Sequence, residues 1–285
     1  MTPDDILFIV NPVSGKRGSK RRILEFLKSR GCRIRITEYA GHAEKIARES
    51  PEKVMVAVGG DGTVNEVARG ITGSGKILGI IPCGSGDGLA RTIGAPYDCR
   101  KNLEAIAAGQ VSDLDWGTVD GRPFFSVCGV GFDAIVSDRF ARAGSRGLPT
   151  YVREALRLWK EFRSEDYVIS TDGERRNVNA AMITVANSNQ WGNGAKIAPL
   201  SSVDDGLLDV CIVHMFKTLE IPRLAFLLMT GKLFRSRRVE YARCREIVIR
   251  RNSPGVAHCD GDCIQAGDRL DIRIGGEPLK VIRYR

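Results

Sequence analysis

Residues 54–71 have the sequence VMVAVGGDGTVNEVARGI, an apolar run that breaks into glycines and then continues with helical periodicity. The run from Val54 to Val58 is short, rich in β-branched residues and bounded by glycine, as expected for a strand of a parallel sheet that is covered on both faces. Thr63 and Glu66 have the spacing of a capping box, which predicts that a helix begins at Thr63. The stretch therefore predicts a strand, a glycine loop and a helix.

The glycine loop in this stretch predicts a phosphate site. Gly59, Gly60 and Gly62 can take a positive φ and let an anion approach the backbone, while the N–H groups and the dipole of the helix start point toward it. Asp61 lies in the middle of the loop, where a carboxylate would repel a bare phosphate. We therefore expect a divalent cation or a substrate hydroxyl to stand beside Asp61. The alternative is a structural turn in which Asp61 has no functional role.

The composition is that of a globular protein. The chain has 285 residues and 43% apolar content, enough for one large domain or two ordinary ones. No apolar run approaches the roughly 18 residues of a membrane span, and the N-terminus lacks the basic region of a signal peptide. We therefore expect a cytoplasmic protein. Eight cysteines are scattered without a C-x-x-C pair, which predicts reduced and mostly buried thiols.

The net charge of +9 is concentrated in two segments. Lys16 to Arg35 holds nine Lys or Arg against one acid, and Lys232 to Arg251 holds eight against two. Such segments form solvated faces, nucleic-acid surfaces, polyphosphate funnels or docking faces for anionic lipid headgroups. The chain has no aromatic-rich basic strand and no zinc-finger spacing, so nucleic acid is not an expected partner.

The two halves of the chain have different patterns. In the first 110 or so residues, three apolar runs each end at a loop of glycine or proline, which predicts a doubly wound parallel sheet that binds ligands at the carboxyl ends of its strands. After about Leu114, the pairs Asp120-Gly121, Asp172-Gly173 and Asp260-Gly261 lie between β-prone runs and predict hairpins of an antiparallel sheet. One apolar stripe at helical spacing interrupts this half, as core or as the lining of an apolar pocket: Tyr151, Val152, Ala155, Leu156, Trp159 and Phe162.

One further match is misleading. Gly70 to Lys76 has the spacing of a Walker loop, but Ile77 stands in place of its Ser or Thr and the segment follows a helix. We expect an ordinary loop there.

The three glycine-bearing strand exits and several later motifs resemble the diacylglycerol kinase catalytic-domain family, which includes bacterial lipid kinases and sphingosine kinases. The similarity runs nearly end to end. Its motifs are Asn11-Pro-Val-Ser-Gly15, Gly59-Gly-Asp-Gly-Thr63, Pro82-Cys-Gly-Ser-Gly86, Gly129-Val-Gly-Phe-Asp133, Asp205-Gly-Leu-Leu-Asp209 and Asp260-Gly-Asp262.

The resemblance implies an ATP-binding α/β domain over residues 1–118 and a β-sandwich domain for a lipid substrate over residues 119–285, with the active site in the cleft between them. It implies that Asp61 acts near the γ-phosphate, its Mg²⁺ and the acceptor hydroxyl, and that Asp262 is the general base. It also implies a structural Mg²⁺ held at Ser202, Asp205 and Leu207. The residues implied for ATP are Asn11, Thr37, Gly59, Gly60, Asp61, Gly62, Thr63, Val64, Asn65, Gly84, Ser85 and Gly86.

Two positions depart from the family pattern. Asp262 replaces a glutamate and is one methylene shorter, so that Asp260 is an alternative base. Asp87 stands where the family usually has Asn, and it adds a negative charge beside the expected phosphates, which needs a metal or an arginine to compensate it.

These observations together predict an ATP- and Mg²⁺-dependent lipid kinase, cytoplasmic and peripheral to the inner face of an anionic membrane. Two alternatives stay open: a soluble-substrate kinase of the NAD kinase type, and a nucleotide-binding regulatory module without catalysis. The sequence leaves open both the acceptor lipid and whether the chain forms a homodimer.

Overall fold

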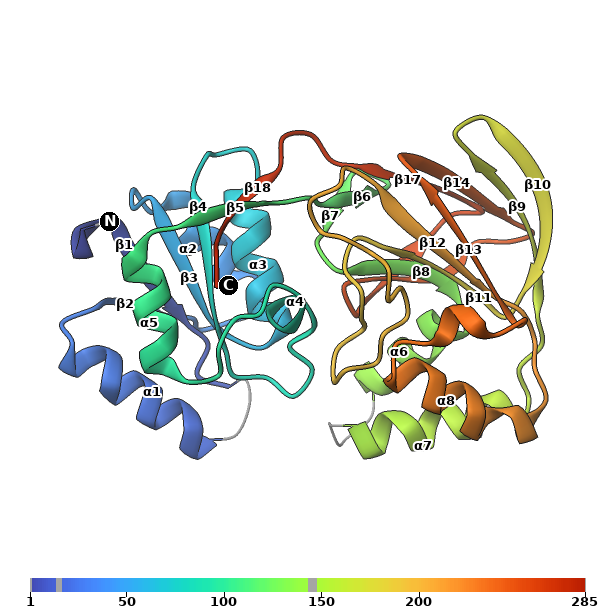
Figure 1. Cartoon of the computed structure of the whole chain (residues 1–285), viewed down its shortest axis with the longest axis horizontal. Helices are drawn as coiled ribbons and strands as arrows, with labels where there is room; N and C mark the ends of the chain where they lie inside the picture. The colour runs from blue at the N-terminus through green and yellow to red at the C-terminus, as the bar shows by residue number, and fades with distance from the viewer. Residues whose placement is uncertain (1, 14–16, 143–147, 285) are drawn as a thin grey trace. The chain divides into compact units, whose positions relative to one another are not determined.

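The structure is a computed structural model that describes residues 2–13, 17–142 and 148–284 (Figure 1). The chain divides into two units. The first comprises Met1–Asp115 together with Gly276–Arg285, and the second comprises Trp116–Gly275.

The first unit is built on a six-stranded sheet with the order β2-β1-β3-β4-β18-β5. Its strands run parallel except β5, which pairs antiparallel with β18. The strands are β1 (Ile6–Val10), β2 (Arg33–Ile36), β3 (Val54–Gly59), β4 (Ile77–Pro82), β5 (Val111–Leu114) and β18 (Leu279–Ile282). The predicted parallel sheet is thus confirmed, with one antiparallel strand at its edge.

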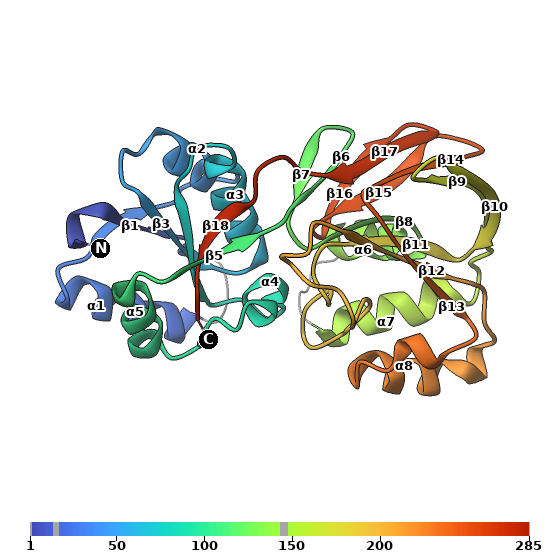
Figure 2. The same cartoon turned by 45° about the horizontal axis from the view of Figure 1, so that its top comes forward.

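Helices cover both faces of this sheet (Figures 1 and 2). On one face, Leu27 of α1 and Ile106 of α5 pack with Phe8 and Val56 in a single buried cluster. Helices α2 and α3 cover the other face. The helices are η1 (Pro3–Asp5), α1 (Arg17–Ser29), α2 (His42–Glu49), α3 (Asp61–Ile71), α4 (Gly88–Thr92) and α5 (Cys99–Ala108). The doubly wound arrangement follows from this placement.

The last strand corrects the expected domain boundary. The sequence predicted that residues 119–285 form the second domain, but β18 lies between β4 and β5 of the first sheet. Tyr284 strengthens this return, because its hydroxyl accepts the Ile80 N–H at 2.7 Å and donates to the Ile80 carbonyl at 3.1 Å. The first unit is therefore discontinuous in sequence.

The second unit contains two six-stranded antiparallel sheets, ordered β10-β9-β14-β17-β6-β7 and β13-β12-β11-β8-β15-β16. Buried side chains from both sheets form one core cluster, in which Ile169, Ile249 and Ile272 of the first meet Val130 and Val185 of the second. The unit is therefore the predicted β-sandwich. Its strands are β6 (Gly117–Val119), β7 (Arg122–Phe124), β8 (Val127–Gly131), β9 (Glu165–Thr171), β10 (Glu174–Ala180), β11 (Met182–Ala186), β12 (Leu208–Val213), β13 (Val239–Cys244), β14 (Glu246–Arg251), β15 (Gly255–Cys259), β16 (Asp262–Ala266) and β17 (Arg269–Ile274).

All three predicted Asp-Gly hairpins are confirmed. They join β6 to β7, β9 to β10 and β15 to β16 through two-residue turns. Asp120, Asp172 and Asp260 have φ values of 49°, 47° and 53°, and the glycine after each also has a positive φ. A turn with two positive φ angles matches the twist of the strands, which explains why this dipeptide could be recognised from sequence.

Helices accompany the sandwich: α6 (Phe132–Arg142), α7 (Leu148–Trp159), η2 (Thr218–Glu220), α8 (Ile221–Met229) and η3 (Leu233–Arg235). The apolar stripe of α7 is only partly core. Trp159 is buried and packs edge-on against Phe132, while Val152 and Leu156 are exposed. The side chain of Tyr151 lies outside the described residues. Over residues 2–13, 17–142 and 148–284, none of the helices combines the length and apolar content that a membrane crossing needs.

The cysteines are thiols, as predicted, and none of the eight forms a disulfide. Cys128, Cys211, Cys244 and Cys259 are buried, and the other four are partly buried. Burial raises the pKa of the Cys99 thiol to about 11, and that of Cys244 to about 12, so both stay protonated near neutral pH.

Candidate functional site

The residues predicted to bind ATP gather at one edge of the first sheet. Neighbouring parallel strands end at the same edge of the sheet, and backbone hydrogen bonds between them continue just past the strand ends. The Thr37 N–H donates to Val10 at 2.9 Å, the Asn11 N–H to Val58 at 3.1 Å, and the Cys83 N–H to Gly59 at 2.8 Å. The loops that follow β1, β2, β3 and β4 are therefore adjacent in space.

The helix after β3 begins two residues earlier than predicted. It starts at Asp61, its N-cap is Gly60, and no side chain caps it. The predicted capping box is wrong, because Glu66 bonds to another helix. The Glu66 carboxylate accepts the N–H groups of Gly41 and Ala43 at 2.9 and 3.1 Å and so caps α2. Thr63 and Val64 donate their N–H groups to the Gly60 carbonyl, which leaves the amides of Asp61 and Gly62 as the first that have no acceptor within the helix.

Asn11 joins the first loop to this helix start. Its Nδ2 donates to Thr63 Oγ1 at 3.0 Å, and its Oδ1 accepts the Val13 N–H at 2.9 Å. The Asn11 side-chain amide thus fixes both the direction of the chain after β1 and the position of the Thr63 side chain. Ser14 and Gly15, the rest of the first predicted motif, lie outside the described residues.

The glycines of the central loop are needed for close packing, not for a positive φ. None of Gly59, Gly60 and Gly62 has a positive φ, which corrects the expectation. A Cβ on Gly59 would lie 2.5 Å from the Thr63 side chain, and one on Gly60 would lie 3.2 Å from the Gly84 Cα. A Cβ on Gly62 would have no atom within 4 Å. Gly59 therefore lets the Thr63 side chain pack against the end of β3, Gly60 lets the loops after β3 and β4 touch, and Gly62 faces open space at the helix start.

Asp61 does not project freely from the loop. Its Oδ2 accepts the Asp87 N–H at 2.9 Å and its Oδ1 accepts the Gly88 N–H at 2.7 Å, so this carboxylate caps α4. A Cβ on Gly86 would lie 2.7 Å from Asp61 Oδ2, which explains the glycine there. Burial raises the pKa of Asp61, and the backbone donors and the charge of Arg91 oppose that shift. Asp61 therefore connects the second and third glycine loops.

Asp87 places a second carboxylate within the same loops. Its φ is 48°, its side chain is 1% exposed, and its Oδ1 accepts the Gly84 N–H at 3.0 Å. Its Oδ2 is buried and has no hydrogen bond of normal geometry among the described residues, although the Tyr97 hydroxyl is close enough to this carboxylate to oppose the rise of its pKa. Burial, and then the charge of Asp61, raise the pKa of Asp87 to about 6. The extra acid is thus buried beside Asp61.

Sequence reasoning did not single out Arg91. Its Nε donates to the Gly86 carbonyl at 3.0 Å, and its guanidinium lies 5.1 Å from the centre of the Tyr97 ring. The residue is exposed and is the fourth residue of the short helix that Asp61 caps. Its position three residues after Gly88, on the first helical turn, is the signal that could have identified it. Arg91 supplies the positive charge that two neighbouring carboxylates require.

The other residues predicted to bind ATP differ in how much of their surface is exposed to solvent. Thr37, Val64 and Asn65 are buried, and Ser85 is exposed. Contacts from Val64 and Asn65 to a nucleotide stay a prediction, as do those from Thr37 and Ser85.

The expected ATP and Mg²⁺ can be tested against these observations. The open space at Gly62 and the adjacent helix N-terminus fit a phosphate group. The orphaned Oδ2 of Asp87 next to Asp61 fits either a proton or a cation, since both remove the cost of a buried and unsatisfied oxygen. The residues present therefore fit a magnesium–nucleotide ligand, although the structure describes no group of three or more His, Cys, Asp or Glu that could hold a metal ion by itself.

In the second unit, the two acids of the Asp-Gly-Asp turn have different surroundings. Asp260 accepts three backbone N–H groups, from Phe125 at 2.9 Å, Ser126 at 2.8 Å and Val127 at 3.0 Å. Asp262 begins β16, its side chain is 51% exposed, and its carboxylate lies 3.2 Å from the Arg122 guanidinium. Asp260 therefore has a structural position, and Asp262 is the accessible carboxylate.

The expected second Mg²⁺ position lies in the loop before β12. Asp205 Oδ1 accepts the Leu207 N–H at 3.1 Å, its Oδ2 lies 3.6 Å from Arg243, and Ser202 Oγ bonds to Asp204. One carboxylate and nearby backbone carbonyls suit Mg²⁺, but Arg243 already occupies the positive position beside Asp205. A cation bound there would have to displace Arg243, so this site stays a prediction.

The segment with Walker-like spacing is a loop, as predicted. Lys76 lies just before β4, and its ammonium donates to the carbonyls of Ala47 at 2.8 Å and Ser50 at 2.7 Å. It therefore neutralises the C-terminal end of α2 and is committed to that structural position.

A buried polar cluster in the sandwich was also missed. Asp133 Oδ2 lies 3.0 Å from His258 Nε2 and accepts the Thr184 hydroxyl at 2.8 Å. All three side chains are buried, and His258 Nδ1 has no hydrogen-bond partner among the described residues. The Gly-x-Gly-Phe-Asp motif contained Asp133, but nothing in the sequence linked it to His258. The cluster joins α6 to β11 and β15.

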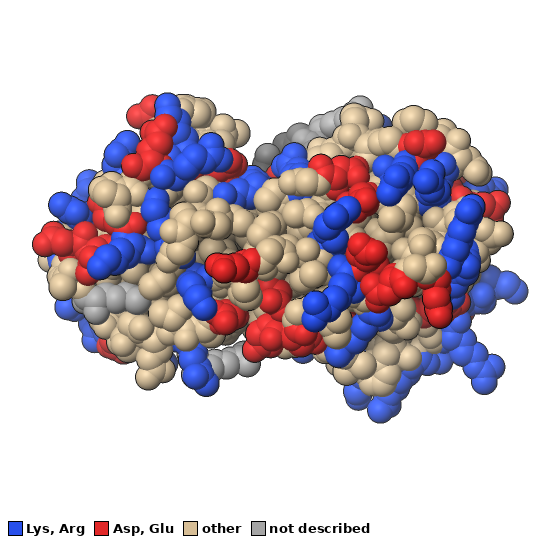
Figure 3. Space-filling model, turned by 90° about the horizontal axis from the view of Figure 1, so that it is seen from above, with Lys and Arg blue, Asp and Glu red and all other residues tan. Residues whose placement is uncertain are grey.

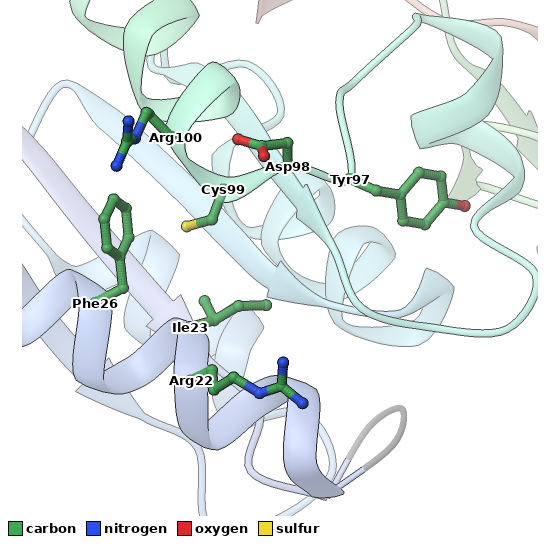
Figure 4. A pocket seen from close by; sticks show the side chains of 7 residues that line it. All are labelled: Arg22, Ile23, Phe26, Tyr97, Asp98, Cys99 and Arg100. Carbon is green, nitrogen blue, oxygen red and sulfur yellow. The ribbon is translucent and has the colours of Figure 1, made fainter.

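A pocket of about 500 Å³ lies elsewhere in the first unit (Figure 4). It lies between α1 and the start of α5, with Ile23, Phe26 and Cys99 on its walls and Arg22 and Arg100 on different sides. None of the residues predicted to bind ATP lines it. Figure 3 shows that basic and acidic side chains are interspersed over the face seen from above, so this face is not uniformly positive.

Two family models match the chain. Residues 5–119 match the diacylglycerol kinase catalytic domain, and residues 126–281, more than half of the chain, match the YegS C-terminal NAD kinase beta sandwich-like domain. The chain is 26% identical over 267 residues to a diacylglycerol kinase of Bacillus subtilis, covering 89% of this chain and 88% of that one. It is 29% identical over 227 residues to a protein of Chromohalobacter salexigens named "Probable lipid kinase YegS-like", covering 75% and 73%.

Solved structures share the fold. A diacylglycerol kinase from Bacillus anthracis superposes with a TM-score of 0.74 at 21% identity, covering 98% of this chain and 96% of that one. An NAD kinase from Archaeoglobus fulgidus in complex with ATP has a TM-score of 0.58 at 12% identity, covering 98% and 94%. Both likenesses concern the fold alone. Since the two family models are matched in order and the larger covers most of the chain, the protein belongs to the diacylglycerol kinase catalytic-domain family of phosphotransferases.

Proposed function

We propose that this chain is an ATP-dependent lipid kinase that transfers the γ-phosphoryl group to the hydroxyl of a diacylglycerol-like or sphingoid-like lipid. The observation that carries the proposal is the start of α3, where Gly62 faces open space beside amides that have no acceptor within the helix. A phosphate group suits this position, because no atom lies within 4 Å of a Cβ added at Gly62 and the amides and dipole of the helix start favour an anion. The names of the relatives support the lipid acceptor.

In this proposal, residues of the first unit bind the nucleotide. The amides at the start of α3 contact its phosphates, and Asn11 holds Thr63 in place beside them. Asp61 keeps the loop after β4 against the loop after β3, and Arg91 balances the charge. Mg²⁺, when bound, would neutralise the charge that develops on the phosphoryl oxygens.

In the second unit, Asp262 is the proposed general base. The lipid hydroxyl oxygen forms a bond to the γ-phosphorus while the bond from that phosphorus to the bridging oxygen of ADP breaks. The hydroxyl proton passes to the Asp262 carboxylate late in the transfer. Asp262 suits this role better than Asp260, because three backbone N–H groups already use the Asp260 oxygens.

The test is transfer of labelled γ-phosphate from Mg-ATP into an organic-extractable product in mixed micelles. Each micelle contains one acceptor: diacylglycerol, a sphingoid base, phosphatidylglycerol or a polyprenol. We expect one acceptor to be labelled, and Asp262→Asn to abolish labelling. The matched control is Asp268→Asn, since Asp268 is also an exposed acid near β16. Loss of labelling in both variants, or in neither, would contradict the assigned base.

A second candidate is a nucleotide-binding module without catalysis. It is favoured by Asp61, whose two oxygens already accept backbone N–H groups. ATP would then raise the thermal midpoint of the protein while no lipid is labelled. Under the same conditions, labelling of NAD would instead support a kinase of the NAD kinase type.

A further inference from the structure

The segment from Lys217 to Arg238 in the second unit has large apolar side chains on its surface. Leu219 is 91% exposed, Phe226 63%, Met229 51% and Phe234 42%. Four such residues in one short segment of a protein in water are unusual, because each leaves apolar area in contact with solvent. We call these four residues, with the cations named below, the α8 surface.

The α8 surface is held in place by the core beneath it. Leu224 and Leu233 are buried in a cluster with Val213 and Val239, and Leu227 and Leu228 pack partly against it. Helix α8 is therefore apolar on the side that faces the core and also at Phe226 and Met229 on the solvent side. A soluble helix normally has polar residues on its outer face, so a second apolar face indicates a further binding partner.

The charge of the segment is strongly positive. It contains six Lys or Arg and one acid, Glu220. Arg238 pairs with Glu220 through two contacts, at 3.0 and 2.9 Å, which neutralises the acid. The exposed cations that remain are Lys217, Arg223, Lys232, Arg235 and Arg237.

A neighbouring helix also carries exposed apolar side chains. Helices α7 and α8 lie next to each other in both views (Figures 1 and 2). Trp159 at the end of α7 stacks on Phe216, just before the segment, with ring centres 4.0 Å apart. Val152 and Leu156 of α7 are also exposed.

We propose that the α8 surface docks on an anionic lipid bilayer. Exposed Leu, Phe and Met side chains can enter the boundary between headgroups and acyl chains, while Lys and Arg reach the phosphates around them. A second copy of the chain is disfavoured as the occupant, because two surfaces of the same positive charge repel. The inference rests on the proposed function only in that a lipid kinase must reach a bilayer.

The test uses the full chain without ATP, so that docking is measured apart from catalysis. Co-sedimentation is measured with vesicles of phosphatidylcholine alone and with vesicles that also contain phosphatidylglycerol. We expect binding to the anionic vesicles that weakens with salt. The double variant Leu219→Ser/Phe226→Ser should bind about tenfold more weakly or worse, and Arg223→Glu/Lys232→Glu should lose the preference for anionic vesicles. All these side chains are exposed, so the thermal midpoint should not change.

Val111→Ser is the matched control, since Val111 is an exposed apolar residue on β5 of the first unit. Equal binding by wild type and the Leu219/Phe226 variant would overturn the proposal, as would equal binding of wild type to neutral and anionic vesicles. Self-association of wild type without vesicle binding would also overturn it and identify a second copy as the occupant. Vesicle binding without phosphorylation of any lipid in micelles would count against the proposed function alone.

Discussion

The Asp61 carboxylate accepts the Gly88 N–H at 2.7 Å, and this contact fixes the start of α4 against the start of α3. The acid that the sequence marked for phosphate chemistry is thus also a helix cap for a segment 27 residues away. The predicted role in phosphoryl transfer and the observed role in local stability therefore fall on the same side chain.

Replacing Asp61 by Asn should reduce stability as well as activity. Asn offers one acceptor oxygen where Asp61 uses two. The amide NH₂ would face either the Asp87 or the Gly88 N–H, at a cost of about 1 to 3 kcal/mol. Differential scanning calorimetry should show a midpoint several degrees lower. An unchanged midpoint would show that the cap contributes little.

The stability of the first unit should decrease as the pH rises from about 4 to 6. Burial raises the folded-state pKa of Asp87 to about 6 from an ordinary value of 3.8. In that window the unfolded chain loses its proton first, so ionisation favours unfolding. Below this window Asp87 is protonated in both the folded and the unfolded states. Above it Asp87 is ionised in both states, and the loss of stability is complete.

Asp87→Asn should remove this dependence. Asn tolerates the left-handed conformation at this position and keeps an acceptor for the Gly84 N–H. We expect it to stabilise the protein at pH 7.5 by about 1 to 3 kcal/mol and to have little effect at pH 4. Asp120→Asn is the control, because Asp120 has a similar φ but is exposed. Equal gains at both pH values would contradict the ionisation argument.

Gly62→Ala and Gly60→Ala should separate ligand binding from packing. An added Cβ at Gly62 meets no atom within 4 Å, and Ala favours a helix by about 1 kcal/mol, so the apo protein should be unchanged or slightly stabilised. At Gly60 the Cβ would crowd the Gly84 backbone and lower the midpoint. If a phosphate lies against Gly62, the thermal shift produced by ATP should shrink in Gly62→Ala. A full shift in that variant would place the nucleotide elsewhere.

Replacing each acid of the Asp-Gly-Asp turn by Asn should have different effects. Asp260→Asn disturbs a carboxylate that accepts three backbone N–H groups, so unfolding in urea should shift by about 1 to 3 kcal/mol. Asp262→Asn removes one exposed ion pair, worth about 1 kcal/mol or less. We therefore expect the first variant to be destabilised and the second to be stable but inactive. The reverse pattern would exchange their roles.

The features that sequence could predict depend on neighbouring residues. The Asp-Gly turns follow from the φ angles of two adjacent positions, and the parallel strands follow from apolar runs that end in glycine. The failures involve long-range partners. Glu66 has the right spacing to cap its own helix, yet it caps α2, and the sequence does not show which backbone N–H groups its carboxylate accepts. The bond from Asp61 to Gly88 and the contact of Asp133 with His258 likewise depend on how separate elements meet.

The return of β18 to the first sheet affects how the chain can fold during synthesis. The segment 116–275 contains every strand of the sandwich, so this unit is complete once those residues have left the ribosome. Most of the first unit is synthesised before the second, but its sheet cannot be completed until residues 279–282 have been made. Until then, β4 and β5 lack β18, the strand that pairs with both of them. The partly synthesised first unit therefore exposes an unpaired sheet edge. Chaperones can bind such an edge, and other chains can aggregate on it.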